Sequence, residues 1–428
     1  MSRTLADWLE FIERQHPESI ALGLDRVRDV ADRVGLGRPA RKVITVAGTN
    51  GKGSTVAFIE AIARANGWRV GAYTSPHLLR YNERVRIDGH DATDAALVAG
   101  FEAVEAARGD TSLTYFEYGT LCALWLFERA QLDLAVLEVG LGGRLDATNL
   151  VDPDVAVVTT VDLDHQDWLG NDREAIGLEK AGIARAWKPL VLGDDDPPAS
   201  VLRHAYAIGA SAIRAGCDFF FEPMPPVAGQ PPQWRWRDVG WSATLPMPAL
   251  AGPVQLRNAA TGVAALRALG KPVSREAMAA GVAGAHLAGR LQRFERDGVE
   301  VLVDVGHNPQ AAAALAAWLA RTPSPGRTHA VFAALSDKDV AGVVAALASS
   351  IDLWSVAGLE EAGPRGQPVA AVATRLAGTA AAGAERFDTV ATALQAALDR
   401  AAAGDRILVF GSFRTAAAAL AMLGSEAA

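Results

Sequence analysis

The chain has 428 residues, half of them hydrophobic, and 41 lysines and arginines against 49 aspartates and glutamates give a formal net charge of −8. This length exceeds what one ordinary core supports, so two or more domains are expected, and the acidic balance without a dense basic tract argues against a nucleic-acid partner. Cys122 and Cys217 are too few for a disulfide framework or a cysteine-based zinc site, and no stretch reaches the ~18 apolar residues of a membrane span.

Residues 2–18 place Leu5, Leu9 and Ile12 at helical spacing among acidic side chains. This amphipathic pattern predicts a surface helix and not a secretory signal. A soluble protein of the cytoplasm, with no membrane partner and acting as a monomer, is therefore expected.

Apolar runs then alternate with helical segments, which predicts an α/β fold with a P-loop-type, mostly parallel sheet. The runs are 42–47, 69–74, 133–139, 154–161 and 189–193. Ligands of open parallel sheets bind at the carboxyl edge, so the residues that follow these runs are the candidate site.

The first run leads into a loop rich in glycine, followed by a helical segment. Its candidate phosphate-binding residues are Thr49, Asn50, Gly51, Lys52, Gly53 and Ser54. Glycines let backbone N–H groups curl around phosphate oxygens, lysine adds positive charge, and serine can reach Mg²⁺. Because Gly53 stands where the general motif has its hydroxyl residue, this is a variant P-loop; the alternative is a plain glycine-rich turn.

Three further segments carry titratable groups. Glu138 is an acid at the end of an apolar run, where it either binds a metal ion or caps the next loop. His165 follows the next run among aspartates, and spacing alone leaves its role open between ligand and structural residue. Lys180, taken by itself, reads as a surface charge.

The segment 219–253, with its prolines and Trp234, Trp236 and Trp241, predicts short hairpins at a domain margin whose tryptophans pack and do not stack on bases. The α/β alternation restarts with runs at 301–305, 328–334, 351–356 and 406–411. We therefore expect a first domain over 1–287 and a smaller Rossmann-like α/β domain over 288–428. Asp304, at the end of its first strand, can hold a ribose hydroxyl.

Together these motifs resemble the folylpolyglutamate synthase and dihydrofolate synthase group of the Mur ligase superfamily. The matching stretches are Gly-Thr-Asn-Gly-Lys-Gly-Ser at 48–54, Thr-Ser-Pro-His-Leu at 74–78, Glu-Val-Gly-Leu-Gly-Gly-Arg-Leu-Asp-Ala-Thr-Asn at 138–149, Asp-His-Gln-Asp-Trp-Leu-Gly at 164–170, Glu-Lys-Ala-Gly-Ile at 179–183, Arg-Asn-Ala at 257–259, His-Asn-Pro at 307–309 and Gly-Ser-Phe at 411–413. One departure is Gly306, where the family usually has alanine.

The resemblance implies an ATP-dependent ligase that adds L-glutamate to dihydropteroate and to folates through an acyl phosphate. By similarity, Thr49 to Ser54 hold the phosphates and Ser54, Ser75, Glu138 and His165 bind Mg²⁺. Lys52, His165 and Lys180 are implied as catalytic residues, and Lys180 matches the lysine that carries a carbamate in this superfamily. The residues implied to hold the rest of the nucleotide are Asn258, Arg290, Asp304 and His307. Residues 285–298 are implied to be the hinge on which the second domain closes over ATP.

A pterin pocket is implied by similarity to the bifunctional members of the group. Its residues are Ile20, Leu22, Thr114, Tyr115, Phe116, Leu145, Asp146 and Ala147. Phe116 offers a face for stacking and Asp146 an acceptor, whereas the alternative treats Ile20, Leu22 and Phe116 as ordinary core residues. Three other functions stay open: folylpolyglutamate synthesis alone, another amino-acid ligase of the Mur type, and a nucleotide-gated switch without ligase turnover.

Overall fold

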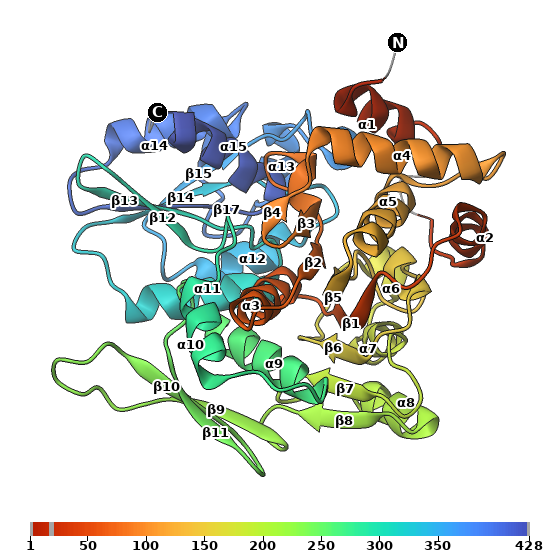
Figure 1. The fold of residues 1–428 in the computed structure, drawn as a ribbon. Coiled ribbons are helices and arrows are strands. Elements are labelled where there is room, and N and C mark those ends of the chain that lie inside the picture. The colour runs from red at the N-terminus through yellow and green to blue at the C-terminus, as the bar shows by residue number, and fades with distance from the viewer. Residues whose placement is uncertain (1–2, 17–20, 426–428) are drawn as a thin grey trace. The chain divides into compact units, whose positions relative to one another are not determined.

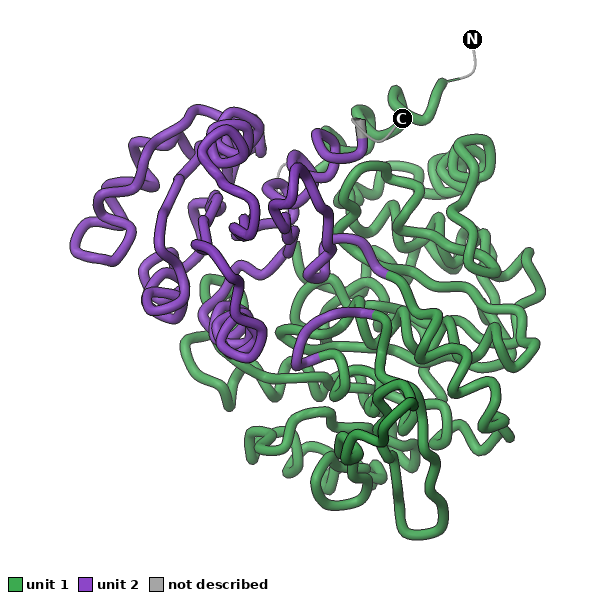
Figure 2. The backbone as a smooth tube through the Cα atoms, turned by 90° about the vertical axis from the view of Figure 1, so that its left-hand side faces the viewer, with its two compact units in different colours: residues 1–249, 255–286 green, residues 250–254, 287–428 purple. Residues whose placement is uncertain are grey.

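The computed structural model describes residues 3–16 and 21–425, which form two compact units (Figure 2). Unit 1 comprises residues 1–249 and 255–286, and unit 2 comprises residues 250–254 and 287–428. The predicted division between residues 287 and 288 did not include residues 250–254, which belong to unit 2.

Unit 1 contains an eight-stranded sheet with the order β4-β3-β2-β5-β1-β6-β7-β8 (Figure 1). The strands are β1 (Ala40–Ala47), β2 (Val70–Tyr73), β3 (Val85–Ile87), β4 (His90–Asp91), β5 (Leu132–Glu138), β6 (Val155–Val158), β7 (Pro189–Leu192) and β8 (Ser211–Arg214). Neighbouring strands are parallel from β2 through β5, β1, β6 and β7 to β8, whereas β3 pairs antiparallel with both β2 and β4. All five predicted runs are strands of this sheet, which confirms the predicted fold class.

Helices cover both faces of the sheet, because its central strands are apolar on both sides. Helix α3 packs against α9 and α10 on one face, while α5, α7 and α8 cover the other. The helices are α1 (Leu5–Glu13), α2 (Asp25–Val34), α3 (Lys52–Ala65), α4 (Asp94–Arg108), α5 (Tyr115–Arg129), α6 (Gln166–Leu169), α7 (Arg173–Ala181), α8 (Ala199–Ile208), α9 (Gln255–Ala268) and α10 (Arg275–Gly284), with short 3₁₀ turns η1 (Tyr81–Arg84) and η2 (Ala147–Leu150). The predicted amino-terminal helix is α1, which buries Trp8 and Ile12.

The proline- and tryptophan-rich segment forms a small antiparallel sheet of β9 (Phe219–Pro223), β10 (Gln233–Asp238) and β11 (Ser242–Pro246). Trp234 and Trp236 are buried, and their Nε1 atoms donate to the carbonyl oxygens of Pro246 (2.8 Å) and Ala260 (3.0 Å). Buried, hydrogen-bonded indoles cannot stack on nucleic-acid bases, so the packing role predicted for these tryptophans is confirmed.

Unit 2 has a six-stranded sheet with the order β12-β13-β17-β14-β15-β16, parallel except for the edge strand β12. Its strands are β12 (Gln292–Arg296), β13 (Val299–Val303), β14 (Thr328–Phe332), β15 (Leu353–Ala357), β16 (Glu385–Phe387) and β17 (Arg406–Phe410), and its helices are α11 (Pro309–Arg321), α12 (Val340–Leu347), η3 (Gly363–Arg365), α13 (Val369–Arg375), α14 (Val390–Arg400) and α15 (Phe413–Ser425). Part of the predicted hinge at 285–298 is therefore the strand β12. Across the described residues of both units, no helix has the length and apolar character needed to cross a membrane.

Candidate active site

The predicted phosphate loop joins β1 to α3 at the carboxyl edge of the sheet of unit 1. Helix α3 begins at Lys52, so its first amide groups and the positive end of its dipole adjoin the loop. The Lys52 ammonium donates to the carbonyl oxygens of Gly48 (2.9 Å) and Thr49 (3.3 Å). The lysine is thus folded back over its own loop, where it places a positive charge beside the amides expected to hold phosphate.

Two threonines that sequence reasoning missed hold this loop from the segment directly after the neighbouring strand β6. Thr159 donates from Oγ1 to the carbonyl oxygen of Asn50 (2.6 Å), and Thr160 accepts the N–H of Asn50 at its own Oγ1 (3.1 Å). The carbonyl oxygen of Thr160 also accepts the N–H of Thr49 (2.8 Å). The signal was present in the sequence as two hydroxyl residues directly after the apolar run 155–158.

Substitution of Gly48 tests whether the shape of this loop determines how tightly the protein binds ATP. Its φ is +151°, and a Cβ there would lie 1.8 Å from Oγ1 of Thr159. We expect Gly48→Ala to lower the free energy of unfolding by about 2 kcal/mol and to raise the KM for ATP by at least about tenfold, because the threonine or the loop must move.

Gly67→Ala is the matched control, since Gly67 also has a positive φ (+80°) but no atom within 4 Å of its added Cβ. It should cost about 1 kcal/mol of stability and leave the KM for ATP unchanged. Denaturant unfolding and initial-rate kinetics measure both effects. An unchanged KM in Gly48→Ala would contradict the assignment of this loop to phosphate binding.

The predicted metal ligands are partly assembled. Glu138 ends β5 and is 5% exposed, and its Oε2 accepts the N–H of Ser75 (3.2 Å). Ser54 is buried in the first turn of α3, and His165 caps the start of α6 with φ +53° while its N–H donates to Asp164 Oδ1 (2.9 Å). Carboxylate, hydroxyl and imidazole suit Mg²⁺ or Mn²⁺.

The protein alone supplies too few ligands for such an ion. Within the described residues no group of three His, Cys, Asp or Glu side chains is arranged to hold a metal. Mg²⁺ at phosphate sites takes one or two protein carboxylates and completes its shell with phosphate oxygens and water. The donor set around Glu138 fits this kind of shared site.

An ion pair that sequence reasoning did not identify connects two parts of the site. Arg86 on β3 contacts Glu60 on α3 at 2.8 Å, and both side chains are largely buried. The Arg86 guanidinium also donates to Oγ1 of Thr74 (3.2 Å), the residue before Ser75. The helix that starts at the phosphate loop is thereby tied to the strand end that carries Ser75.

Lys180 lies on α7 and is 4% exposed, so it is not the surface charge that its sequence context alone suggested. Burial, followed by the nearby positive charge of Lys52, lowers the pKa of Lys180 to about 7, although Asp164 and Asp146 oppose the shift. Four charged residues from four segments therefore interact at this edge of the sheet. The neutral amine is therefore far more populated at neutral pH than it is for an ordinary lysine.

The turn 139–149 fixes the position of α7. The N–H of Arg144 donates to the carbonyl oxygen of Glu179 (2.8 Å), and the Arg144 guanidinium pairs with the Glu179 carboxylate (2.8 Å). A Cβ at Gly143 would lie 2.7 Å from that same carbonyl oxygen, so the backbones approach closely. This contact holds Lys180 next to the turn that contains Asp146.

The residues implied to form a pterin pocket lie together, except Ile20, which is outside the described residues. The N–H of Gly23, next to the half-buried Leu22, donates to the carbonyl oxygen of Leu145 (3.3 Å). Thr114 caps α5, and Tyr115 and Phe116 form its first turn. Ala147 is buried. The amino-terminal segment, α5 and the turn 139–149 therefore meet at one place.

Two of these residues have additional structural roles. The Asp146 carboxylate accepts N–H groups of Gly140 (3.0 Å), Leu141 (2.9 Å) and Thr148 (3.0 Å) and the Thr148 hydroxyl (2.6 Å). Burial raises the pKa of Asp146, and these hydrogen bonds oppose the shift. A ligand donor has to share an oxygen with one of them. Phe116 is half-buried, with its ring centroid 5.9 Å from that of Tyr73.

In unit 2 the predicted nucleotide residues gather at the carboxyl edge of its sheet. Asp304 follows β13 and accepts the N–H groups of Leu291 (2.9 Å) and Gly306 (2.7 Å), one at each oxygen, which leaves each oxygen a further acceptor position. Burial raises the pKa of Asp304 and Arg290 opposes the shift. Arg290 lies 5.3 Å above the ring of Phe413, and His307 contacts the same ring at 6.3 Å.

Phe413 was part of the last quoted motif but had no predicted role; the structure places its half-buried ring beside Arg290 and His307. In unit 1, Asn258 on α9 is buried, and its Oδ1 would lie 2.5 Å from a Cβ at Gly51 of the phosphate loop. The predicted nucleotide residues thus form one group at the carboxyl edge of each unit's sheet.

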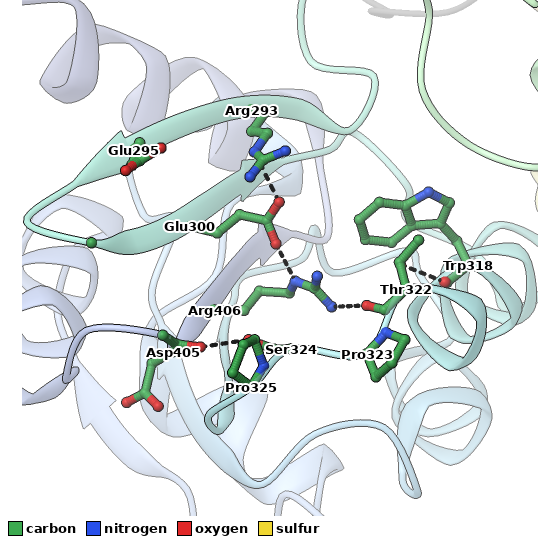
Figure 3. A pocket seen from close by; sticks show the side chains of 12 residues that line it. Arg293, Glu295, Glu300, Trp318, Thr322, Pro323, Ser324, Pro325, Asp405 and Arg406 are labelled. Atoms are coloured by element: carbon green, nitrogen blue, oxygen red, sulfur yellow. Dashed lines mark hydrogen bonds and ion pairs between the residues drawn. The ribbon is translucent and has the colours of Figure 1, made fainter. Parts of the chain in front are cut away.

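A cavity of about 400 Å³ in unit 2 lies at the opposite, amino ends of β13 and β17 (Figure 3). There the buried Arg406 contacts Glu300 Oε2 (2.6 Å) and the carbonyl oxygen of Thr322 (2.7 Å), and it lies over Trp318 (5.1 Å). Because Glu300 pairs with both Arg406 and Arg293, we assign these charged groups a structural role; they lie at the end of the sheet opposite the candidate site.

Two family models match the chain: the Mur ligase middle domain over residues 46–218 and the Mur ligase glutamate ligase domain over residues 289–413. The chain is 48% identical to the Escherichia coli dihydrofolate synthase/folylpolyglutamate synthase over 96% of this chain and 94% of the relative. It is 34% identical to the Lacticaseibacillus casei folylpolyglutamate synthase over 77% of this chain and 80% of that relative.

Solved structures agree with these relationships. The structure of E. coli FolC in complex with DHPP and ADP matches with a TM-score of 0.92 and 46% identity, covering 100% of this chain and 99% of that one. Mycobacterium tuberculosis folylpolyglutamate synthase complexed with ADP and AMPPCP matches with a TM-score of 0.86 and 31% identity, over 98% of this chain and 99% of that one. The chain therefore belongs to the dihydrofolate synthase/folylpolyglutamate synthase family of Mur ligases.

Proposed function

We propose that the protein is a bifunctional ATP-dependent ligase that joins L-glutamate to dihydropteroate and to folates. Transfer of the γ-phosphoryl group of ATP to the acceptor carboxylate forms an acyl phosphate, and the amino group of glutamate then displaces phosphate to form the amide. One observation carries this proposal: the phosphate-loop lysine, the buried Glu138 and the buried, weakly basic Lys180 come together at one edge of the unit 1 sheet.

In this proposal, different residues of unit 1 bind the phosphates of ATP and the Mg²⁺ ion, and both groups neutralise phosphate charge. Lys52 and the amides of residues 49–54 hold the phosphates, and Ser54, Ser75, Glu138 and His165 hold Mg²⁺, which neutralises phosphate charge when it is bound. Phosphoryl transfer depends mainly on such positioning. Thr159 and Thr160 keep the loop in the shape that its amides need.

The environment of Lys180 favours formation of the carbamate that the family resemblance implied for this residue. Carbamate formation needs a neutral amine, and the pKa of about 7 supplies one at neutral pH. Burial and the charges of Lys52, Asp164 and Asp146 act on the Lys180 ammonium, and no hydrogen bond contributes to its pKa shift. The new anion would face the metal site and help to position Mg²⁺.

The remaining residues bind substrates. Asn258, Arg290, Asp304 and His307 contact the nucleotide, with Asp304 accepting a ribose hydroxyl through its open acceptor positions. Leu22, Thr114, Tyr115, Phe116, Leu145, Asp146 and Ala147 enclose the pterin, and Ile20 belongs to the same proposed set. We place the enzyme in the cytoplasm.

Phe116→Ala tests the pterin pocket. We expect the KM for dihydropteroate to rise by about tenfold or more while the KM for ATP changes less than about twofold, because the stacking face is lost and the phosphate loop is untouched. Initial rates with each substrate varied in turn give both constants. Phe127→Ala, which truncates a fully buried ring of the same helix, is the control: it should lower stability without this selectivity. An equal rise of both KM values in Phe116→Ala would mean that Phe116 only packs.

Phosphate release separates the alternatives. The protein is incubated with ATP and, in separate reactions, dihydropteroate, a monoglutamyl folate or a cell-wall precursor, each with and without L-glutamate. Glutamate-dependent release with both acceptors supports the bifunctional enzyme, and release with the folate alone supports a folylpolyglutamate synthase. Stimulation only by a cell-wall precursor indicates another Mur-type ligase, whereas release that no amine affects indicates a nucleotide switch.

A further inference from the structure

A cavity of about 290 Å³ in unit 1 is separate from every residue assigned above. Its lining comes from β9, β10, the start of α9 and the loops around β7 and β8. The residues that matter here are Asp195, Phe220, Glu222, Arg235, Arg237 and Arg257. Three guanidinium groups outnumber the carboxylates of Asp195 and Glu222, so the lining has a net positive charge, as expected of an anion site.

Arg257 is the fixed member of this group. Its guanidinium donates to the carbonyl oxygen of Gly193 (3.0 Å) and pairs with the carboxylate of Asp195. The side chain therefore ties α9 to the loop after β7, and its charge is largely neutralised. The positive charge available to a ligand comes from the other two arginines.

Arg235 and Arg237 are exposed and alternate along β10, so they project from the same face of the small sheet. In the part of the chain that the structure describes, neither guanidinium has a hydrogen bond or an ion pair. Glu222 lies opposite Arg235 in the strand register but forms no ion pair with it. Arg237 stacks over the ring of Phe220 at 4.2 Å, which fixes the guanidinium plane while leaving its N–H edge available to a carboxylate.

The cavity borders the same sheet edge as the candidate active site. Gly193 and Asp195 directly follow β7, and β7 is separated from β1 and its phosphate loop by β6 alone. At about 4.8 Å per strand, the strand ends are about 10 Å apart. At about 290 Å³ the cavity is at the lower limit of pockets for drug-sized ligands, ~300–1,000 Å³, so it suits a section of chain and not a whole folate.

We propose that Arg235 and Arg237 bind α-carboxylates of the γ-linked glutamate tail of a folate substrate. The inference rests on the proposed function, which makes a product that gains one α-carboxylate with every residue added. Planar guanidinium groups match carboxylates through paired N–H···O bonds. The pocket thereby distinguishes acceptors by tail length, and it plays no part in dihydropteroate ligation because dihydropteroate carries no glutamate.

The double variant R235Q/R237Q tests this assignment with two acceptors, tetrahydropteroyl triglutamate and dihydropteroate. We expect the KM for the triglutamate to rise about tenfold while kcat and the KM values for dihydropteroate and ATP stay within about twofold of wild type. The matched control is R327Q/R386Q, which removes two exposed, unpaired arginines of unit 2 and should leave all these constants unchanged.

Other outcomes overturn the proposal. An unchanged triglutamate KM would mean that no tail site exists here, an equal rise for dihydropteroate would indicate a general structural effect, and a rise confined to ATP would assign the pocket to nucleotide phosphates. If the double variant does not fold, R235Q and R237Q singly provide the same comparison. If wild type does not ligate dihydropteroate at all, the proposed function itself fails, which is a distinct result.

Discussion

Lys52→Ala is expected to abolish ligation while the protein stays folded. The ammonium is the positive charge of the phosphate loop, and it donates to the carbonyl oxygens of Gly48 and Thr49 in that loop. Loss of a positioned cation at a transferring phosphoryl group costs about 10²–10³-fold in rate or more. The free energy of unfolding should change by about 1 kcal/mol or less, since no core packing is removed.

Lys188→Ala is the control for this substitution, because it removes the same charge from an exposed position of unit 1. Glutamate-dependent phosphate release and urea unfolding should both be near wild type in the control. If Lys52→Ala kept full ligase activity, the loop would not be the site of phosphoryl transfer.

Lys180→Met is expected to inactivate the enzyme and at the same time to stabilise it. The pKa of Lys180 falls from 10.5 to about 7 because burial disfavours the ammonium. At pH 7 and below, the folded protein holds a buried ammonium that the unfolded chain keeps in water, which lowers the free energy of unfolding by up to about 5 kcal/mol. Methionine has similar length and no charge, so it removes this penalty.

The pH dependence gives the sign of the effect. The pKa of Lys180 is lower in the folded protein than in the unfolded chain. Between pH 7 and 10.5 the unfolded state therefore binds more protons. As a result, the contribution of Lys180 to the wild-type free energy of unfolding becomes more favourable as pH rises. The advantage of Lys180→Met should therefore be largest at pH 7 and below and should shrink as pH approaches 10.5. Denaturant unfolding in CO₂-free buffer measures this without a carbamate, and Lys188→Met is the control.

Activity provides the second half of this prediction. Ligation should fall by about 10²–10⁴-fold in Lys180→Met, because no carbamate can form on methionine. A variant that was both less stable and fully active would show that Lys180 is a structural residue. Stabilisation with loss of function is the pattern of a residue kept for catalysis at a cost in stability.

The sequence predicted those features that depend on local order along the chain. Apolar runs located the central strands of both sheets, and the glycine-rich segment at 48–54 located the loop between β1 and α3. The short strands β3, β4, β8, β12 and β16, which lie at a sheet edge or next to one, were missed because strands of two to five residues carry little apolar pattern.

What the sequence could not supply were contacts between distant segments. Lys180 has the local context of a surface lysine, and only the docking of the turn 139–149 onto α7 buries it. The same is true of Thr159 and Thr160, whose hydrogen bonds to the phosphate loop span more than 100 residues of sequence. Family resemblance assigned a role to Lys180, whereas neither the resemblance nor the residue patterns pointed to Thr159 and Thr160.

The most direct test of the account follows an oxygen atom. Dihydropteroate labelled with ¹⁸O in its carboxyl group is ligated to L-glutamate, and the released inorganic phosphate is analysed by mass spectrometry. If the acceptor is activated as an acyl phosphate, one labelled oxygen enters each phosphate released. Phosphate without label, alongside normal formation of the amide, would contradict the mechanism on which every residue assignment here depends.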